Sequence, residues 1–329
     1  MTLAKLALGF AFRSLILGMA IAAGFAQAQS GYPARPVRML VGFPPGGGTD
    51  LTARIVATNL AERLGQPVVV ENRVGAGGNI AMDAIAKAAP DGYTIGVAGS
   101  LITINATLQP NLPFDPVKDF APITKLVSNP LVLFSNPAFE AKDLRQLIAL
   151  AKAKPGAISY GSPGAGTAMH LVGALLNQSA GMNLVHVAYK GNGPVVNDVL
   201  GGQVPLGVAD VASTLSFIKS GRLHVIGVAT PQRTRVAPEL PTLAESGLPG
   251  FQVQSWTGVV APARTPPEII TRLNANIRAI LENAEVRDKL LAAGLEPAPN
   301  TPEEFAEVIR TETQRWAKAI RETGVKPDS

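Results

Sequence analysis

The chain of 329 residues contains no cysteine, which excludes disulfides, thiol catalysis, thiolate metal ligands and lipid attachment through an N-terminal cysteine. It has only three histidines, and neither a His-x-x-x-His pair nor an acidic cluster has the spacing of metal ligands. No glycine loop continues into Lys-Ser/Thr, and none reads Gly-x-Gly-x-x-Gly, so nucleotide binding is not indicated. We therefore expect neither a metal nor a cofactor.

Apart from its N-terminus, the sequence also lacks long hydrophobic runs. Residues 1–28 combine the cations Lys5 and Arg13 with an apolar core over residues 15–25, and they end in a small-x-small site. This is the pattern of a cleaved secretory signal peptide, and its apolar core is shorter than the ~20 residues that span a bilayer. We predict that residues 1–28 are removed and that the mature chain resides in the periplasm.

Neither sign of charge dominates the mature chain. The formal net charge is +5 and falls to +3 without the two cations of the predicted signal peptide. A weak and dispersed positive charge does not match a surface that binds nucleic acid. We expect a small-molecule partner rather than a nucleic acid, and a monomer.

What the sequence does contain is a regular alternation of apolar, strand-like runs with helix-like segments. Alternation at this spacing is typical of βαβ units in a parallel sheet. It stops in a proline-rich interval, residues 110–137, and then starts again, which indicates two domains. We predict an α/β protein of two lobes, each a mostly parallel sheet flanked by helices, joined by two crossover strands near Pro130 and Trp256. Lobe 1 would comprise residues 29–130 and 251–329, and lobe 2 residues 131–250.

Two helices near the C-terminus have clear start signals. Thr265 and Thr301 each precede a proline, and a glutamate follows each threonine three residues later. This order is typical of a threonine N-cap, a proline at the first helical position and a capping box. We predict that a helix begins at each position.

Two apolar runs end in glycine-rich loops that open helices. The first loop follows residues 37–43 and the second follows residues 158–160. Backbone N–H groups at a helix N-terminus bind anions, and glycine lets a ligand approach the backbone closely. Two such loops in different lobes predict a clamp for a solute with negatively charged or polar ends, the alternative being tight turns without a ligand. The donors in question belong to Gly46, Gly47, Gly48 and Thr49, and to Ser162, Gly164, Gly166 and Thr167.

Several side chains near these loops have two interpretations. Asp50 either complements the helix dipole or has a function, such as fixing the loop or receiving a ligand amine. His170 either reaches the cleft or packs in the interior. Asp210 either forms hydrogen bonds at the cleft wall or caps the helix before Ser213.

A secreted hydrolase or isomerase is the rival class of function. Serine hydrolases place their nucleophile in Gly-x-Ser-x-Gly, whereas the residue two before Ser162 is Tyr160. No nucleophile with a base and no pair of tuned carboxylates is evident. The sequence therefore favours a binding protein that is not an enzyme.

A series of short motifs covers essentially the whole mature chain in order. They are Gly-Phe-Pro-Pro-Gly-Gly-Gly-Thr-Asp at residues 42–50, Val-Glu-Asn-Arg at 70–73, Gly-Ala-Gly-Gly at 75–78, Pro-Asp-Gly-Tyr-Thr at 90–94, Gly-Ser at 161–162 with Gly-Thr at 166–167 and His170, Tyr-Lys-Gly at 189–191, and Pro-Thr-Leu-Ala-Glu-Ser-Gly at 241–247. In these motifs the chain resembles the periplasmic solute receptors of tripartite tricarboxylate transporters, the Bug or TctC-like family.

The resemblance implies a type II-like periplasmic binding protein, whose two α/β lobes close like a flytrap on a small organic solute, usually a carboxylate. It also implies that backbone amides and small hydroxyls of both loops hold the ends of the ligand. The implied ligand contacts in this chain are Phe43, Gly46, Gly47, Gly48, Thr49, Asp50, Ser100, Ser162, Gly166, Thr167, His170, Tyr189 and Asp210. The implied partner is a membrane permease, and a membrane sensor that reads the closed form is the alternative.

Overall fold

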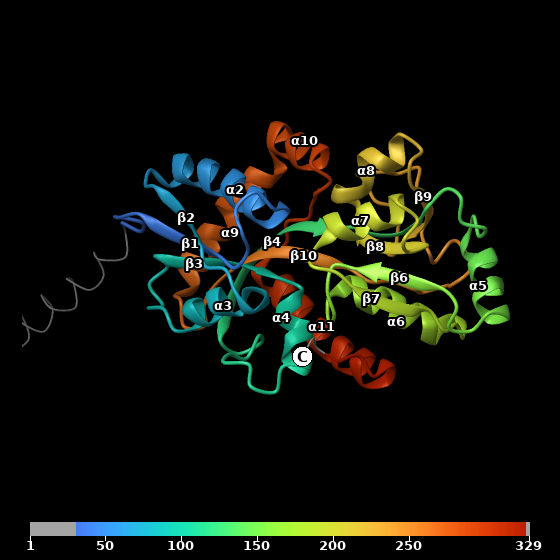
Figure 1. The fold of residues 1–329 in the computed structure, drawn as a ribbon. Coiled ribbons are helices and arrows are strands. Elements are labelled where there is room, and N and C mark those ends of the chain that lie inside the picture. The colour runs from blue at the N-terminus through green and yellow to red at the C-terminus, as the bar shows by residue number, and fades with distance from the viewer. Residues whose placement is uncertain (1–30, 327–329) are drawn as a thin grey trace, which may run out of the picture.

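The computed structural model describes residues 31–326 and contains two α/β lobes, each built on its own sheet (Figure 1). The two-lobed α/β class predicted from the sequence is confirmed. The predicted signal peptide, residues 1–28, lies outside the described residues. Among residues 31–326, none of the helices combines the length and the hydrophobicity that crossing a bilayer requires.

The first sheet has six strands in the order β11-β4-β10-β3-β1-β2. Its strands are β1 (Val37–Val41), β2 (Val68–Asn72), β3 (Thr94–Gly99), β4 (Phe120–Asn129), β10 (Ser255–Pro262) and β11 (Glu296–Pro297). The helices of this lobe are α2 (Gly48–Leu64), the 3₁₀ turn η1 (Ala76–Gly78), α3 (Asn79–Ala86), α4 (Leu101–Leu108), α9 (Pro267–Glu282), α10 (Ala284–Ala292) and α11 (Pro302–Thr323).

The second sheet has five strands in the order β7-β6-β8-β5-β9. Its strands are β5 (Leu131–Ser135), β6 (Ser159–Ser162), β7 (Val185–Ala188), β8 (Leu206–Asp210) and β9 (His224–Val228). The helices between them are α5 (Leu144–Ala153), α6 (Ala168–Ala180), α7 (Asn192–Leu200) and α8 (Val211–Lys219).

The strand directions differ from the mostly parallel sheets that we predicted. In the first sheet β1 is parallel to β2 and β3, but β10 is antiparallel to β3 and β4, and β11 to β4. In the second sheet β6 is parallel to β7 and β8, but β5 is antiparallel to β8 and β9. Both sheets are therefore mixed. Alternation of strands and helices reveals the parallel units, but it does not reveal the direction of strands that pass from one lobe to the other without a crossover helix.

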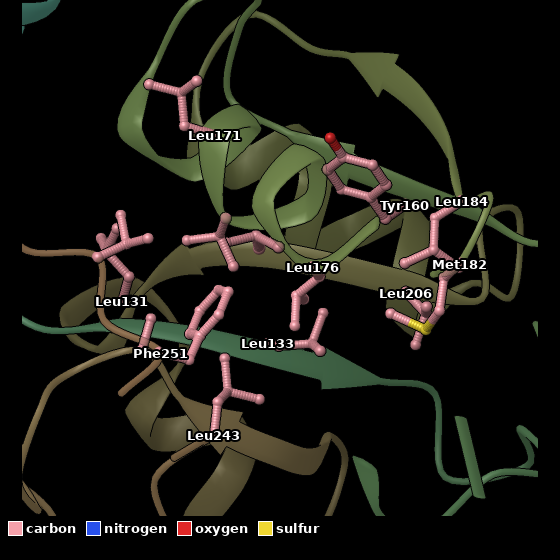
Figure 2. Close-up of a cluster of buried hydrophobic side chains, with 14 of the residues drawn as sticks. Leu131, Leu133, Tyr160, Leu171, Leu176, Met182, Leu184, Leu206, Leu243 and Phe251 are labelled. Carbon is pink, nitrogen blue, oxygen red and sulfur yellow. The ribbon is translucent and has the colours of Figure 1, made fainter. Parts of the chain in front are cut away.

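The chain crosses between the lobes at Pro130, which joins β4 directly to β5, and returns before β10. A further apolar contact joins the lobes, because Leu108 of α4 and Trp316 of α11 belong to one buried cluster with the core of the second lobe. Figure 2 shows the part of this cluster around Leu133, Tyr160, Leu176 and Phe251. In Figure 1, α11 (red) accordingly runs from below the first sheet toward α6.

A helix begins at both predicted positions, α9 at Pro267 and α11 at Pro302, but only one of the two threonine N-caps is confirmed. Thr301 caps α11 through a complete capping box with Glu304. At the other start the N-cap is Pro266, since the Thr265 hydroxyl donates to the Pro262 carbonyl instead (2.8 Å). A threonine that bonds back to a preceding turn is not available to cap a helix.

The packing of α6 on β6 requires a glycine. A Cβ on Gly173 of α6 would lie 2.1 Å from the Tyr160 ring. Alanine normally stabilises a helix interior by up to about 1 kcal/mol relative to glycine, but here we expect Gly173→Ala to lower the free energy of unfolding by about 1–3 kcal/mol. Urea denaturation measures the effect, and an increase in stability would contradict this packing of α6 on β6.

Candidate functional site

The carboxyl ends of the parallel strands in both lobes lie beside the crossing between the lobes. Gly99, the last residue of β3, pairs with Thr257 of β10. Ser255, the first residue of β10, pairs with Asn129, the last residue of β4 before the crossing. On the other side of Pro130, Leu131 pairs with Asp210, the last residue of β8. The loops that follow these strands therefore border the region between the lobes, where open α/β sheets bind their ligands.

In the first loop, Asp50 fixes the chain. Its buried carboxylate accepts hydrogen bonds from the Gly46 amide (3.0 Å), from Arg54 Nε (2.9 Å) and from Asn72 Nδ2 (2.8 Å). Asn72 also donates to the Phe43 carbonyl (2.9 Å), so the two side chains together hold both ends of the loop. These contacts favour the loop-fixing interpretation of Asp50.

The pKa of Asp50 predicts an acid sensitivity. The hydrogen bond from Arg54, supported by Asn72 and Gly46 and opposed by burial, lowers this pKa from 3.8 to about 2. Because the folded pKa is depressed, the stabilisation is present above about pH 4 and is lost as the pH falls toward 2. The stability gap between wild type and Asp50→Asn should narrow by about 1 kcal/mol between about pH 5 and about pH 3, as measured by denaturation. A constant gap would contradict the ionised, paired state.

The N-terminus of α2 leaves backbone donors available. Its N-cap is Gly47, which has no side chain to cap the helix, and Gly46 to Gly48 are exposed. The first-turn amides of Gly48, Thr49 and Asp50 have no intrahelical acceptor by helix geometry. The Gly46 amide, in contrast, donates to Asp50, so the backbone donors that remain in this loop are the helix amides and not the amide of the glycine that precedes them.

The second loop is held in a similar way by its own side chains. Thr167 is the N-cap of α6: its hydroxyl accepts from the His170 amide (3.2 Å) and donates to the Gly164 carbonyl (2.8 Å). The Gly166 amide donates to Nδ1 of His170 (3.1 Å). The amides of Ala168 and Met169 remain as first-turn donors without an intrahelical partner.

Two of the predicted ligand contacts, Ser162 and His170, both contact His186 of β7. Ser162 is fully buried, and its Oγ lies 2.7 Å from Nε2 of His186. The His170 ring stacks on the His186 ring, with centroids 3.7 Å apart and planes inclined by 7°. Both rings line a pocket of about 540 Å³ with residues of α6 and the end of α11. The Ser162–His186 pair resembles a nucleophile with its base, but a fully buried hydroxyl cannot reach a substrate.

Tyr189 and Asp210 also have partners within the second lobe. The Tyr189 hydroxyl donates to Asp198 (2.8 Å), and burial followed by this hydrogen bond raises its pKa to about 12. Asp210 caps α8 by accepting from the Ser213 amide (2.8 Å), as the capping interpretation predicted, and its other oxygen accepts from Asn192 Nδ2 at the start of α7. Asp210 thereby fixes the starts of two neighbouring helices.

The remaining predicted contacts lie at the end of β3 and beside the first loop. Ser100 is buried, and its Oγ lies 3.1 Å from that of Ser255 at the start of β10. The Phe43 ring packs near Gly78, where an added Cβ would lie 3.5 Å from the ring. Ser100 thus joins the first sheet to the strand that returns from the second lobe.

Close contacts join the lobes around these loops. A Cβ on Gly166 would lie 2.6 Å from Leu108 of α4, and one on Gly294, between α10 and β11, would lie 2.4 Å from the Cα of Ala212 in α8. A Cβ on Gly48 would lie 3.5 Å from Leu295, the neighbour of Gly294. The first loop and the start of α8 are therefore linked through one short segment.

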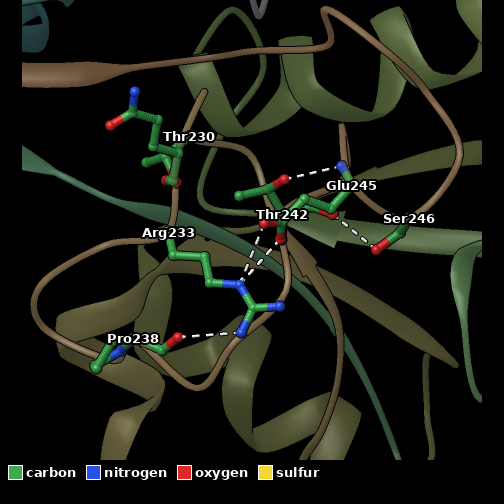
Figure 3. A network of polar contacts seen from close by, with 7 residues as sticks. Thr230, Arg233, Pro238, Thr242, Glu245 and Ser246 are labelled. Carbon is green, nitrogen blue, oxygen red and sulfur yellow. Dashed lines mark hydrogen bonds and ion pairs between the residues drawn. The ribbon is translucent and has the colours of Figure 1, made fainter.

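A polar bridge completes the contact beside the crossing. Glu296 of β11 accepts from Thr234 Oγ1 and Arg235 Nε of the other lobe, both at 2.8 Å. The neighbouring Arg233 pairs with Glu245 and the Pro238 carbonyl, and Figure 3 shows this network. The segment after β9 is thus ordered by its own side chains and contacts the first lobe through Thr234 and Arg235.

Sequence reasoning did not single out four supporting residues. Arg54 and Asn72 bind Asp50, Asn192 binds Asp210, and His186 contacts Ser162. Asn72 lies within the Val-Glu-Asn-Arg motif and could have been found there. Arg54 follows Asp50 by four residues on α2, a spacing that pairs side chains on a helix and could also have been found. Asn192 and His186 come from other elements than their partners, and only the fold brings each pair together.

Comparison with known families gives a match over most of the chain. A family model described as the tripartite tricarboxylate transporter family receptor matches residues 52–325. Protein BugT of Bordetella pertussis is 40% identical over 316 residues, which cover 94% of this chain and 97% of BugT.

Solved structures have the same fold. A protein of R. palustris with adipate aligns with a TM-score of 0.80 at 32% identity, over 90% of this chain and 100% of that chain. MatC from Rhodopseudomonas palustris with bound malate aligns with a TM-score of 0.74 at 32% identity, over 88% of this chain and 100% of MatC. Both similar structures are described with a dicarboxylate.

Proposed function

Because this chain belongs to the tripartite tricarboxylate transporter receptor family, a family of solute-binding receptors and not of enzymes, we propose that it captures a small dicarboxylate between its two lobes. The single observation that carries this proposal is the presence of two helix N-termini, those of α2 and α6, at strand ends that border the region between the lobes. Malate and adipate, which are named with two similar structures, support a dicarboxylate as the class of ligand.

The proposed contacts divide into donors and supports. The first-turn amides of α2 and α6, with the Thr49 hydroxyl, would receive the two ends of the ligand, and Phe43 would pack against its carbon chain. Hydrogen bonds to a charged group contribute about 1.5–3 kcal/mol each, and a helix dipole about 1 kcal/mol. A few of these reach the ~8 kcal/mol of micromolar binding before ordering costs are subtracted. Arginine is not required.

The remaining predicted contacts would position the donors. Asp50 fixes the first loop, Ser162 and His170 the second, and Asp210 the start of α8. Tyr189 and Ser100 form side-chain hydrogen bonds with Asp198 and Ser255 in the same region. We propose that the ligand meets these residues through the loops that they hold.

We propose that ligand binding shifts an equilibrium of lobe arrangements and that the closed form is read at the membrane. The moving bodies would be residues 29–130 with 251–329, and residues 131–250. The proposed reader is the permease of a tripartite tricarboxylate transporter, with the receptor monomeric in the periplasm after removal of residues 1–28. A membrane sensor is the second candidate, and vesicles that contain the permease distinguish the two by solute uptake.

Calorimetry of the mature protein with malate, adipate and a neutral diamide of the same length tests the ligand class. We expect micromolar binding of at least one dicarboxylate and at least tenfold weaker binding of the diamide, since the amide has no charge for the two helix N-termini. Equal binding of the diamide would overturn the anion-binding role of the loops. N-terminal sequencing of the secreted protein should give Gln29 as its first residue.

A further inference from the structure

The second loop rests on a pair of histidines from two different elements. His170 comes from α6 and His186 from β7, and their rings stack at 3.7 Å. Each ring has its own contact with the loop: the Gly166 amide donates to His170 Nδ1, and Ser162 Oγ lies 2.7 Å from His186 Nε2. Any change in the charge of this pair therefore acts directly on the loop.

The contacts decide where a proton resides. A parallel stack at this distance disfavours two cations, so the pair takes up one proton before both rings are charged. The Gly166 amide needs the lone pair of His170 Nδ1, and a proton on that nitrogen would break the hydrogen bond. His186 faces a hydroxyl instead, which can accept as well as donate. The proton therefore belongs to His186.

The groups that face the pair from the surrounding elements are compatible with one positive charge. Tyr160 of β6 packs against the His186 ring, and burial raises the pKa of its hydroxyl, so it stays neutral. The C-terminal end of α11 and the residues after it contribute Glu322 and Lys326 to the same pocket. Glu322 is bonded to Gln178 of α6 and lies 3.8 Å from Lys318.

We propose that His186 is a positioning residue for the ligand-binding loop, and that its protonation strengthens the binding of a dicarboxylate. The protonated ring donates to Ser162, keeps His170 neutral for Gly166 and places a positive charge behind the amides of α6. This inference rests on the proposed function. One added charge near a partly solvated anion site changes the affinity for the anion about three- to fivefold.

Malate binding at about pH 6 and about pH 8 tests this proposal, because histidine titrates between these values whereas malate stays doubly ionised. The wild type should bind about three- to fivefold more tightly at the lower pH. His186→Gln, which keeps a hydrogen-bonding group, should bind with the same affinity at both. His224→Gln is the matched control, since His224 lies at the far end of β9 against Lys142, and it should behave like the wild type. A pH dependence that persists in His186→Gln would overturn the proposal.

A second measurement needs no ligand. NMR titration of the histidine ring signals in the free protein should show one ionisation for the stacked pair between about pH 5 and about pH 8, assigned to His186 by its absence from His186→Gln. Ionisation of His170 in that range would overturn the assignment. If no carboxylate bound, the proposed function would be refuted, and the NMR titration would still test whether the proton of the stacked pair resides on His186.

Discussion

Gly294→Ala should lower the affinity for the dicarboxylate at least tenfold. Gly294 lies in the first lobe at φ +78°, and an added Cβ would lie 2.4 Å from the Cα of Ala212 and 3.0 Å from its backbone nitrogen in the second lobe. Backbone atoms at the start of a capped helix cannot move aside as a flexible side chain does. The lobes would therefore have to separate at the point that links the first loop to α8, and the two sets of donors would no longer meet one ligand.

Gly294→Ala would introduce both the clash with Ala212 and the strain of an alanine at positive φ, and a control must separate the two effects. Gly250→Ala is the matched control, because Gly250 has the same φ of +78° with nothing within 4 Å of an added Cβ. Both variants should lose about 1–2 kcal/mol of unfolding free energy from the backbone alone. Calorimetry with malate should then show a loss of affinity only for Gly294→Ala. Equal affinities of the two variants would show that this interlobe contact is not part of the ligand-bound arrangement.

Asp50→Asn should destabilise the protein by about 2–4 kcal/mol and weaken the dicarboxylate about tenfold or more. The carboxylate accepts from three donors, and the amide of asparagine would direct hydrogen atoms toward at least one of them. The loop between Phe43 and Gly48 would lose the contacts that fix it. Because residue 50 is buried, water cannot take over the hydrogen bonds that the carboxylate makes.

Asp91→Asn is the control for the loss of an ion-paired aspartate. Asp91 pairs with Arg35 at 3.0 Å and accepts from the Tyr93 amide, but its side chain is 44% exposed and lies away from both loops. An exposed pair contributes about 0–1 kcal/mol, so this variant should be nearly as stable as the wild type and bind malate equally. Urea denaturation and calorimetry of both variants make the comparison. Similar losses in the two would contradict the special role of Asp50.

The sequence predicted the lobes and their loops because these depend on local patterns. The run from Val37 to Val41 is buried except for Arg38, and a glycine-rich loop separates it from the start of α2 at Gly48. Thr301 caps α11 because its partner Glu304 is only three residues away. Such features need no knowledge of distant parts of the chain.

What could not be predicted depends on residues far apart in the sequence. The directions of β5 and β10 follow from the crossings between the lobes, and the packing of Trp316 with the second lobe follows from the path of α11. The roles of Ser162 and His170 followed the same rule. Ser162 was predicted as a ligand donor, and His170 was predicted either to reach the cleft or to pack in the interior. The contacts of both with His186, on a different strand, could not be predicted from local patterns.

A crystal structure of the mature protein with malate tests the account most directly. We expect one carboxylate within hydrogen-bonding distance of the amides of Gly48 and Thr49 and the other within that distance of the amides of Ala168 and Met169. Malate bound at one lobe alone, or in a different part of the molecule, would contradict the two-ended grip.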